Sequence, residues 1–248
     1  RKTWNNTNSI INYTLVIKLK IDGDLTPITI YNETVLQITP QINMSSGYYY
    51  AFAYKQWKSK NQPPVVCVPS GNFGNICAGI LAHLSGLPTL HFIAACNRND
   101  TIPRFLQSGN YTPRSAVATW SNAMDVAEPS NFIRILELFQ HRLPDLQQQL
   151  SSCSVSDEQT LQTIRQVQDR FGYTLDPHGA VGFFALDQYL QQHPQQAGYF
   201  LETAHPVKFP EAIKVATRLE VPVPHLLEPL LQREKVSTLL EADYSALR

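Results

Sequence analysis

The stretch VVCVPSGNFGNICAG, at residues 65–79, constrains the fold of this chain more than any other feature of the sequence. An apolar, β-branched run leads into a turn that contains Gly71 and Gly74, and apolar residues with helical spacing follow from Asn75. This order predicts a buried strand, a glycine turn and a helix.

The glycine turn suggests a class of ligand. Glycines at 71 and 74 remove two Cβ atoms and permit positive φ angles, so that several backbone N–H groups can converge at the start of a helix. Phosphate is the ligand that such a turn favours. An ordinary turn that needs glycine only for close packing would show the same pattern.

A second strand is expected over 89–95, after a helix that ends at Ser85 and Gly86. Strand, helix and strand in this order predict neighbouring parallel strands, which carry ligands at their carboxyl ends. A third strand over 199–201 would deliver Thr203 and His205 to the same edge. The polar residues that follow the first two strands, and should face one cleft, are Ser70, Asn72, Asn75, Asn97, Arg98, Asn99, Asp100 and Thr101.

The N-terminal part predicts a β-hairpin and a helix. Residues 11–37 contain β-rich runs around Asp22-Gly23, a hairpin signal, and Pro27 places the second strand at an edge. The aromatic segment 47–57 predicts a buried helix. Its four tyrosines could instead stack on bases, but core packing is favoured because no arginines are interleaved with them.

Two amphipathic helices are expected in the second half. The first covers 132–143 with Ser130 as its N-cap, and the second covers 157–171 with a capping box of Ser156 and Gln159. Segment 103–118, which has turn signals, is expected at the surface.

Composition indicates a small-molecule partner. The 248 residues are 43% hydrophobic, and 20 basic residues balance 20 acidic ones, so nucleic acid and membrane surfaces are not expected partners. The four cysteines form no CxxC pair, which argues against a metal site and a disulfide framework. No signal-peptide pattern or membrane-length apolar run occurs, and we expect a cytoplasmic protein.

Four motifs in a fixed order identify a family. VPSGNFGNICAG, NDTIPRF, VATWSNAMDVAEPSNFIRILELF and TAHPVKF together closely resemble threonine synthase over most of residues 65–210. Short segments near the ends, NSI at 8–10 and DYSALR at 243–248, resemble the same family. The resemblance implies an α/β fold: a three-layer domain with a parallel sheet, of the tryptophan-synthase-β-like, fold type II class.

The resemblance also implies a pyridoxal 5′-phosphate enzyme, a lyase of threonine biosynthesis that converts O-phospho-L-homoserine and water to L-threonine and phosphate. Matching the family motif places the cofactor phosphate on Gly71, Asn72, Phe73, Gly74 and Asn75. It places the hydroxyl of Thr203 at the pyridine nitrogen.

The NDTIPRF motif matches cleft residues of the family, which implies substrate binding by Asn99, Asp100, Thr101 and Arg104. Arg104 could hold a substrate anion through its guanidinium fork, or it could form a structural ion pair.

Two family motifs do not occur in these 248 residues: a second glycine-rich segment that resembles TSGDTG, and the segment that carries the lysine bonded to the cofactor. Threonine synthases carry the lysine that bonds the cofactor in a segment resembling HGPTLAFKDF, and no lysine here has that context. We therefore expect the carboxyl-terminal, phosphate-binding portion of such an enzyme, with the lysine segment missing or on another chain. Within it we expect an N-terminal segment over 1–46, in which 11–37 is inserted, and a large cofactor-binding domain over 47–248.

Two other functions stay open. The chain could be a catalytically inactive module that binds a phosphorylated small molecule, or a structural remnant without a ligand.

Overall fold

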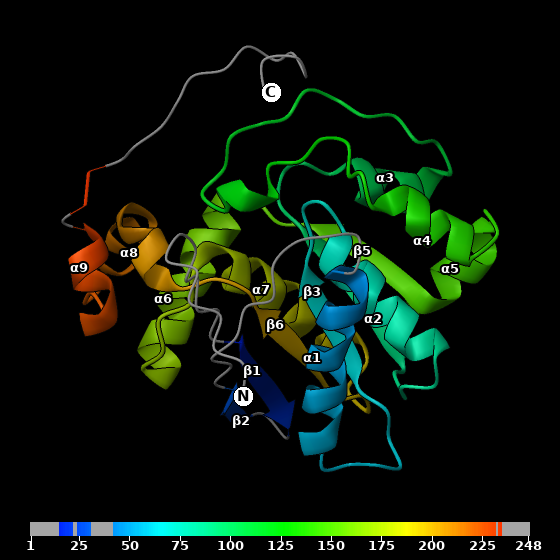
Figure 1. Ribbon diagram of the computed structural model, residues 1–248, viewed down its shortest axis with the longest axis horizontal. Coiled ribbons are helices and arrows are strands. Elements are labelled where there is room, and N and C mark those ends of the chain that lie inside the picture. The colour runs from blue at the N-terminus through cyan, green and yellow to red at the C-terminus, as the bar shows by residue number, and fades with distance from the viewer. Residues whose placement is uncertain (1–14, 22–23, 31–41, 232, 235–248) are drawn as a thin grey trace.

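A six-stranded sheet forms the centre of the computed structural model, which describes residues 15–21, 24–30, 42–231 and 233–234 (Figure 1). The strand order is β2-β1-β6-β3-β4-β5. Strands β6, β3, β4 and β5 are parallel, and the hairpin of β1 and β2 extends the sheet antiparallel to β6. The strands are β1 (Leu15–Ile21), β2 (Asp24–Ile30), β3 (Val65–Pro69), β4 (His91–Cys96), β5 (Leu150–Ser154) and β6 (Gly198–Glu202).

Helices cover both faces of this sheet and make three layers (Figure 1). One face carries α1 (Ile42–Gln56), α2 (Gly74–Leu84), α3 (Thr101–Ser108), α4 (Phe132–Leu138) and α5 (Leu143–Gln149). The other carries α6 (Asp157–Phe171), α7 (Pro177–Gln192) and α8 (Pro210–Thr217). Short helices η1 (Asn122–Met124), η2 (Pro206–Lys208), η3 (His225–Leu227) and α9 (Glu228–Leu231) complete the described elements.

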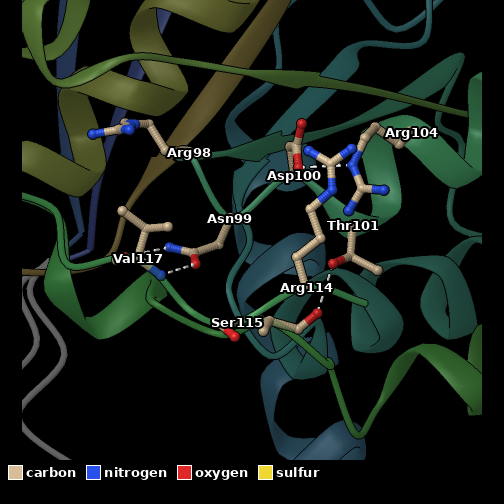
Figure 2. Close-up of a pocket in the computed structure, with 9 residues that line it drawn as sticks. Arg98, Asn99, Asp100, Thr101, Arg104, Arg114, Ser115 and Val117 are labelled. Carbon is tan, nitrogen blue, oxygen red and sulfur yellow. Dashed lines mark hydrogen bonds and ion pairs between the residues drawn. The ribbon is translucent and has the colours of Figure 1, made fainter. Parts of the chain in front are cut away.

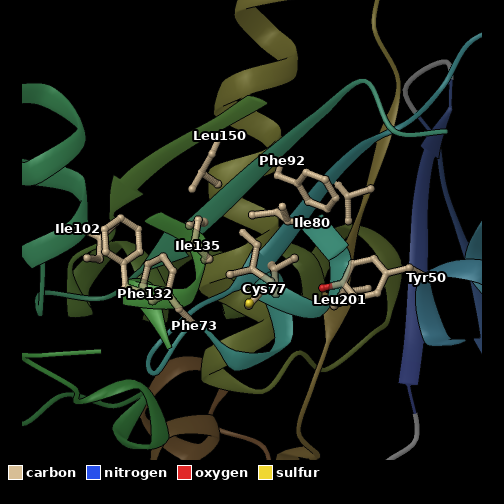
Figure 3. Packing of buried hydrophobic residues seen from close by; sticks show 14 of the residues in the cluster. Tyr50, Phe73, Cys77, Ile80, Phe92, Ile102, Phe132, Ile135, Leu150 and Leu201 are labelled. Atoms are coloured by element: carbon tan, nitrogen blue, oxygen red, sulfur yellow. The ribbon is translucent and has the colours of Figure 1, made fainter. Parts of the chain in front are cut away.

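Two hydrophobic cores follow from the alternation of side chains along β3. Val66 and Val68 pack with α1 and α2 in the first core, part of which Figure 3 shows, and Val65 and Cys67 pack with α7 in the second. All four side chains are fully buried. The central strand is thus covered on both sides, as parallel strands usually are.

The crossover and the hairpin predicted from the sequence are confirmed. β3, α2 and β4 form the expected unit, with Cys67 opposite Ile93 in a parallel pair. In the hairpin Ile21 pairs with Asp24, and β2, which contains Pro27, is the edge strand. A division of the chain after residue 46 stays a prediction, and α1 crosses that position. The end segments 8–10 and 243–248 lie outside the described residues.

Two predictions about local structure were wrong, and one strand was missed. Residues 101–108, partly assigned to a surface segment, form α3, because Pro103 in a first turn costs no helical hydrogen bond. The helix expected over 132–143 ends at Leu138, and α5 begins at Leu143. Strand β5 was not predicted, because three of its five residues are serines.

Ser156 caps α6 as expected. Its Oγ accepts a hydrogen bond from the Gln159 N–H at 3.1 Å, and Gln159 Oε1 accepts one from the Ser156 N–H at 2.9 Å. We expect Ser156→Ala to lower the free energy of unfolding by about 1 kcal/mol, because the Gln159 N–H loses the Ser156 Oγ as its acceptor. Urea unfolding checks this, with the exposed Ser85→Ala as a control that should change stability by less than about 0.5 kcal/mol. Equal effects of the two substitutions would contradict the prediction.

The described helices include none that is both long enough and apolar enough to cross a membrane. All four cysteines are free thiols; Cys67, Cys77 and Cys96 are buried, and Cys153 is half-buried. Burial raises the pKa of the Cys153 thiol to about 11, and that of Cys96 to about 12 despite a hydrogen bond from Ser152 that lowers it. These thiols therefore stay protonated at neutral pH and belong to the packing of the sheet.

Candidate functional site

The turn between β3 and α2 has a backbone shape that few residues adopt. Phe73, the residue before α2, has a φ of 62° and lies in the left-handed region. This conformation is unfavourable for a bulky residue and persists only where the surroundings hold it. The Phe73 ring is held in the first core, 5.4 Å from the Phe132 ring. The aromatic anchor thus fixes the direction of the amides around it.

The backbone N–H groups of residues 71 to 76 lie in the turn before α2 and in its first residues. Within the described ranges, none of them donates a hydrogen bond to a carbonyl or a side chain. Helix N-termini leave such donors unused and carry a partial positive charge, which together favour an anion. Gly71 and Gly74 are half-buried and Asn72 is exposed, so the turn is open to a ligand. These residues fit a phosphate group.

The side chains of this turn have other partners. Asn72 Oδ1 accepts hydrogen bonds from the Ser130 N–H at 2.7 Å and the Ser130 Oγ at 3.0 Å. Tyr50 Oη donates to Asn75 Oδ1 at 2.8 Å. Ser130 was expected to cap α4, but Asn131 takes the cap position and Ser130 binds the glycine turn instead. The backbone, and not the side-chain oxygens, is what the turn offers to an anion.

Thr203 lies at the same edge of the sheet as the glycine turn. In the parallel pair of β3 and β6, Cys67 is opposite Phe200, and continuing this register by three residues brings Ser70 opposite Thr203. Adjacent strands lie about 4.8 Å apart. Thr203 is half-buried, as is His205 two residues further on. Thr203 and the glycine turn thus follow the carboxyl ends of two neighbouring parallel strands.

A pocket of ≈ 190 Å³ opens at the end of β4 (Figure 2). It contains the four predicted substrate residues and others that sequence reasoning missed. Arg104 Nε pairs with Asp100 Oδ1 at 2.9 Å, so the structural ion pair considered from the sequence is present. Figure 2 shows the Arg114 side chain extending toward Arg104 beside Asp100. The residues that line the pocket are Arg98, Asn99, Asp100, Thr101, Arg104, Arg114, Ser115, Val117 and Ala127.

Asp125 holds the wall of this pocket in place and was missed from the sequence. Its Oδ1 accepts hydrogen bonds from Asn97 Nδ2 at 2.8 Å, Thr119 Oγ1 at 2.7 Å and Asn99 Nδ2 at 3.1 Å. Asn99 also binds the backbone of Val117 through both its amide atoms. Asn99 is thus a structural link between β4 and the loop that follows α3.

Three ionisable side chains form a buried group at the end of β6, and one of them, Glu202, directly precedes Thr203. Asp176, His178 and Glu202 are 0%, 3% and 1% exposed. Asp176 caps α7, and its Oδ1 accepts hydrogen bonds from the His178 N–H and from His178 Nδ1, both at 2.8 Å. Burial alone would raise the pKa of Asp176, but the bonds and charge of His178, with a bond from Glu202, lower it below its usual value.

His205 lies three residues after Glu202. Its Nδ1 accepts a hydrogen bond from the Val207 N–H at 3.1 Å. Burial lowers its pKa, although the charge of Asp176 opposes this shift and that of Lys208 adds to it. His205 is thus favoured in the neutral form, with its proton on Nε2. Across the described residues, no three His, Cys, Asp or Glu side chains are grouped to hold a metal ion.

Comparison with known proteins identifies the family. Residues 30–199 match the family model described as pyridoxal-phosphate dependent enzyme. The chain belongs to this family. Residues 179–248 match a second model, described as threonine synthase, C-terminal. The resemblance to threonine synthase found in the motifs is therefore confirmed.

Bacterial threonine synthases are similar in sequence to this chain. Threonine synthase of Escherichia coli (strain K12) is 44% identical over 201 residues, which cover 81% of this chain and 46% of the relative. The threonine synthase of Haemophilus influenzae is 41% identical over the same length. The chain spans about half the length of the curated relatives that it matches.

Solved structures confirm the fold class. The crystal structure of threonine synthase from Escherichia coli matches with a TM-score of 0.75 and 40% identity, covering 83% of this chain and 47% of that one. Threonine synthase of Brucella melitensis, solved with pyridoxal phosphate bound, matches with a TM-score of 0.76 and 30% identity. The match covers 86% of this chain and 51% of the Brucella chain. The described chain is thus an α/β domain of the fold type II class.

Proposed function

We propose that this chain forms the part of a threonine synthase that binds the cofactor phosphate, in an enzyme that converts O-phospho-L-homoserine and water to L-threonine and phosphate. The observation that carries this proposal is the row of N–H groups from 71 to 76 without partners in the described ranges, at the start of α2. They open at the sheet edge that also carries Thr203. The match of residues 30–199 to the family supports pyridoxal phosphate as the anion that they bind.

Each part of the site has a role in this proposal. The amides of Gly71, Asn72, Phe73, Gly74 and Asn75 hold the phosphate, and the Thr203 hydroxyl meets the pyridine nitrogen. The bound cofactor supplies an electron sink for substrate carbanions. The chain supplies orientation, because Asn72 and Asn75 are fixed by Ser130 and Tyr50. Neutral His205, which holds a proton at Nε2, lies at the same edge of the sheet.

The pocket at the end of β4 is the proposed site for an anionic group of the substrate. Arg104 keeps guanidinium N–H groups beyond those that bind Asp100 and the Thr112 carbonyl. Arg114 lines the same pocket, and within the described residues it has no ion pair. Three arginines, Arg98, Arg104 and Arg114, line the pocket with one carboxylate, and the net positive charge favours a phosphorylated amino acid.

Arg114→Gln tests this assignment. We expect it to weaken the binding of O-phospho-L-homoserine about tenfold in chain saturated with pyridoxal phosphate, since a charge-assisted contact is lost. The control is Arg165→Gln on α6, a helix on the opposite face of the sheet from α3. Arg165 pairs weakly with Asp169 of the same helix, with 3.8 Å between Nε and Oδ2. Isothermal titration measures both. Equal affinity of the two variants would remove Arg114 from the site.

The lysine that bonds the cofactor is proposed to come from outside these residues, on the same chain or on another. The alternative function is an inactive module that binds a phosphorylated ligand, and the intact glycine turn favours binding in either case. Borohydride treatment after addition of pyridoxal phosphate separates the two. We expect reversible binding without stoichiometric attachment to this chain, and release of threonine only when a lysine-bearing segment is supplied. Stoichiometric attachment to one lysine of this chain would contradict the proposal.

A cytoplasmic location is also a proposal. It fits the four free thiols, because disulfides are rare in the reducing cytosol.

A further inference from the structure

The buried group of Asp176, Glu202 and His178 has no part in the reaction proposed above, although its member Glu202 directly precedes Thr203. Its two carboxyl groups are 0% and 1% exposed and come from different elements, the start of α7 and the end of β6. Ionised carboxylates are rarely buried together, because neither water nor a cation compensates their repulsion. The group therefore needs a specific arrangement of protons.

The contacts indicate that arrangement. Asp176 Oδ1 takes two hydrogen bonds from His178, and the Asp176 N–H donates to Glu202 Oε1 at 3.3 Å. An interaction between the side chains of Asp176 and Glu202 is among the causes that lower the pKa of Asp176. The Oδ2 atom of Asp176 has no N–H donor among the described residues. A bond between two carboxyl groups requires a proton on one of them.

The proton belongs on Glu202. Two N–H donors at one oxygen stabilise the ionised form of Asp176, as they do in caps and ion pairs. We propose that Glu202 stays protonated, donates its proton to the Asp176 carboxylate, and acts as a positioning residue for Thr203. This inference rests on the proposed function in one respect: Thr203 is the residue that meets the cofactor ring.

The packing explains how this bond sets the position of Thr203. Gly179 lies against the Glu202 carboxyl group, and a Cβ there would overlap it, so α7 approaches the end of β6 closely. Glu202 is thereby held by α7 on two sides, through the Asp176 backbone and side chain. Thr203 follows Glu202 directly, and so the direction in which the chain leaves β6 is fixed.

Other charged or ionisable groups surround the pair. His178 comes from α7, Tyr173 from the loop before it, and His205 and Lys208 from the segment after β6. Burial raises the pKa of Tyr173, so the phenol stays neutral. Ionisation of Glu202 would add a second buried negative charge within this group.

Infrared spectroscopy tests the location of the proton. We expect a carbonyl band of a protonated carboxylic acid at neutral pH, sensitive to exchange in heavy water, that disappears in Glu202→Gln and persists in the control Glu211→Gln on the exposed side of α8. Absence of this band from the unmodified chain, or its persistence in Glu202→Gln, would overturn the inference.

Amide NMR of Thr203 tests the positioning role without any cofactor. We expect the Thr203 amide resonance to move as alkaline pH ionises Glu202, to be displaced in Glu202→Ala, and to be restored in Glu202→Gln without the alkaline titration. An amide resonance that is the same in all three proteins at every pH would overturn the role.

Pyridoxal phosphate affinity then connects the pair to the proposed function. We expect about tenfold weaker binding in Glu202→Ala and recovery in Glu202→Gln, because glutamine still donates to Asp176. Equal affinity of the unmodified chain and Glu202→Ala would overturn the positioning role. If the unmodified chain binds no pyridoxal phosphate while the infrared and NMR results stand, the proposed function fails and the shared proton is supported.

Discussion

Gly71→Ala is expected to weaken pyridoxal phosphate binding by about 10- to 100-fold. A Cβ atom at this position would lie 2.7 Å from the Met124 Cα and 3.2 Å from the Ala123 carbonyl oxygen. Both neighbours are backbone atoms and cannot rotate away, so the turn itself must shift. The loss of one hydrogen bond to a charged group costs about 1.5–3 kcal/mol, which corresponds to this range.

Gly74→Ala provides the matched control in the same turn. The nearest atom to its added Cβ is the Asn131 Nδ2, at 3.3 Å, which donates to the Asn72 carbonyl at 3.0 Å and has to give by only a few tenths of an ångström. We expect a loss of affinity of less than about fivefold, because a contact with a side chain relaxes more easily than a contact with the backbone. Spectrophotometric titration measures both variants, and urea unfolding verifies that both are folded. A larger loss in Gly74→Ala than in Gly71→Ala would contradict the account of the turn.

Asp176→Ala is expected to lower the free energy of unfolding by about 3–5 kcal/mol, the range for removing one member of a buried charged pair. The substitution removes the N-cap of α7 and leaves the His178 Nδ1–H and the Glu202 carboxyl group buried without their acceptor. The control is Asp169→Ala on the exposed side of α6, where we expect less than about 0.5 kcal/mol. Urea unfolding at neutral pH checks both.

The effect of Asp176 should depend on pH in a definite direction. Its pKa is lowered in the folded protein, so its contribution is fully present above the pKa of the unfolded chain. The contribution is lost as the pH falls through the lowered pKa. The stability difference between the unmodified chain and Asp176→Ala should therefore shrink on acidification. A difference that grows toward acid pH would show that Asp176 is not the ionised partner.

Local signals in the sequence were enough to predict the elements around the site. Gly71 and Gly74 marked the turn, Asp22-Gly23 marked the hairpin, and Ser156 marked the start of α6, because each acts on its neighbours within a few residues. β5 is different. Its serine-rich sequence becomes a strand only because β4 offers an unpaired edge, which no local pattern reveals.

Local patterns in the sequence also reveal only part of the site. The turn residues, Thr203 and the NDTIPRF residues were found because motifs name them. Asp125 was missed, although it lies inside the WSNAMD motif, because it binds Asn97, which directly follows β4. Arg114 was missed because only the fold brings it to the pocket that Arg104 of α3 also lines. Glu202 was missed because its partner Asp176 is 26 residues away. Ser130 was assigned to a cap, since sequence spacing could not show that Asn72 would bind it.

The central claim is that backbone amides at the start of α2 hold the cofactor phosphate. A titration of the isotope-labelled chain with pyridoxal phosphate, followed by amide NMR, tests it most directly. We predict saturable shifts that are largest at residues 71 to 76, with a smaller shift at Thr203, and competition by inorganic phosphate at the first set alone. Saturable binding that leaves the amides of residues 71 to 76 unchanged would contradict the claim.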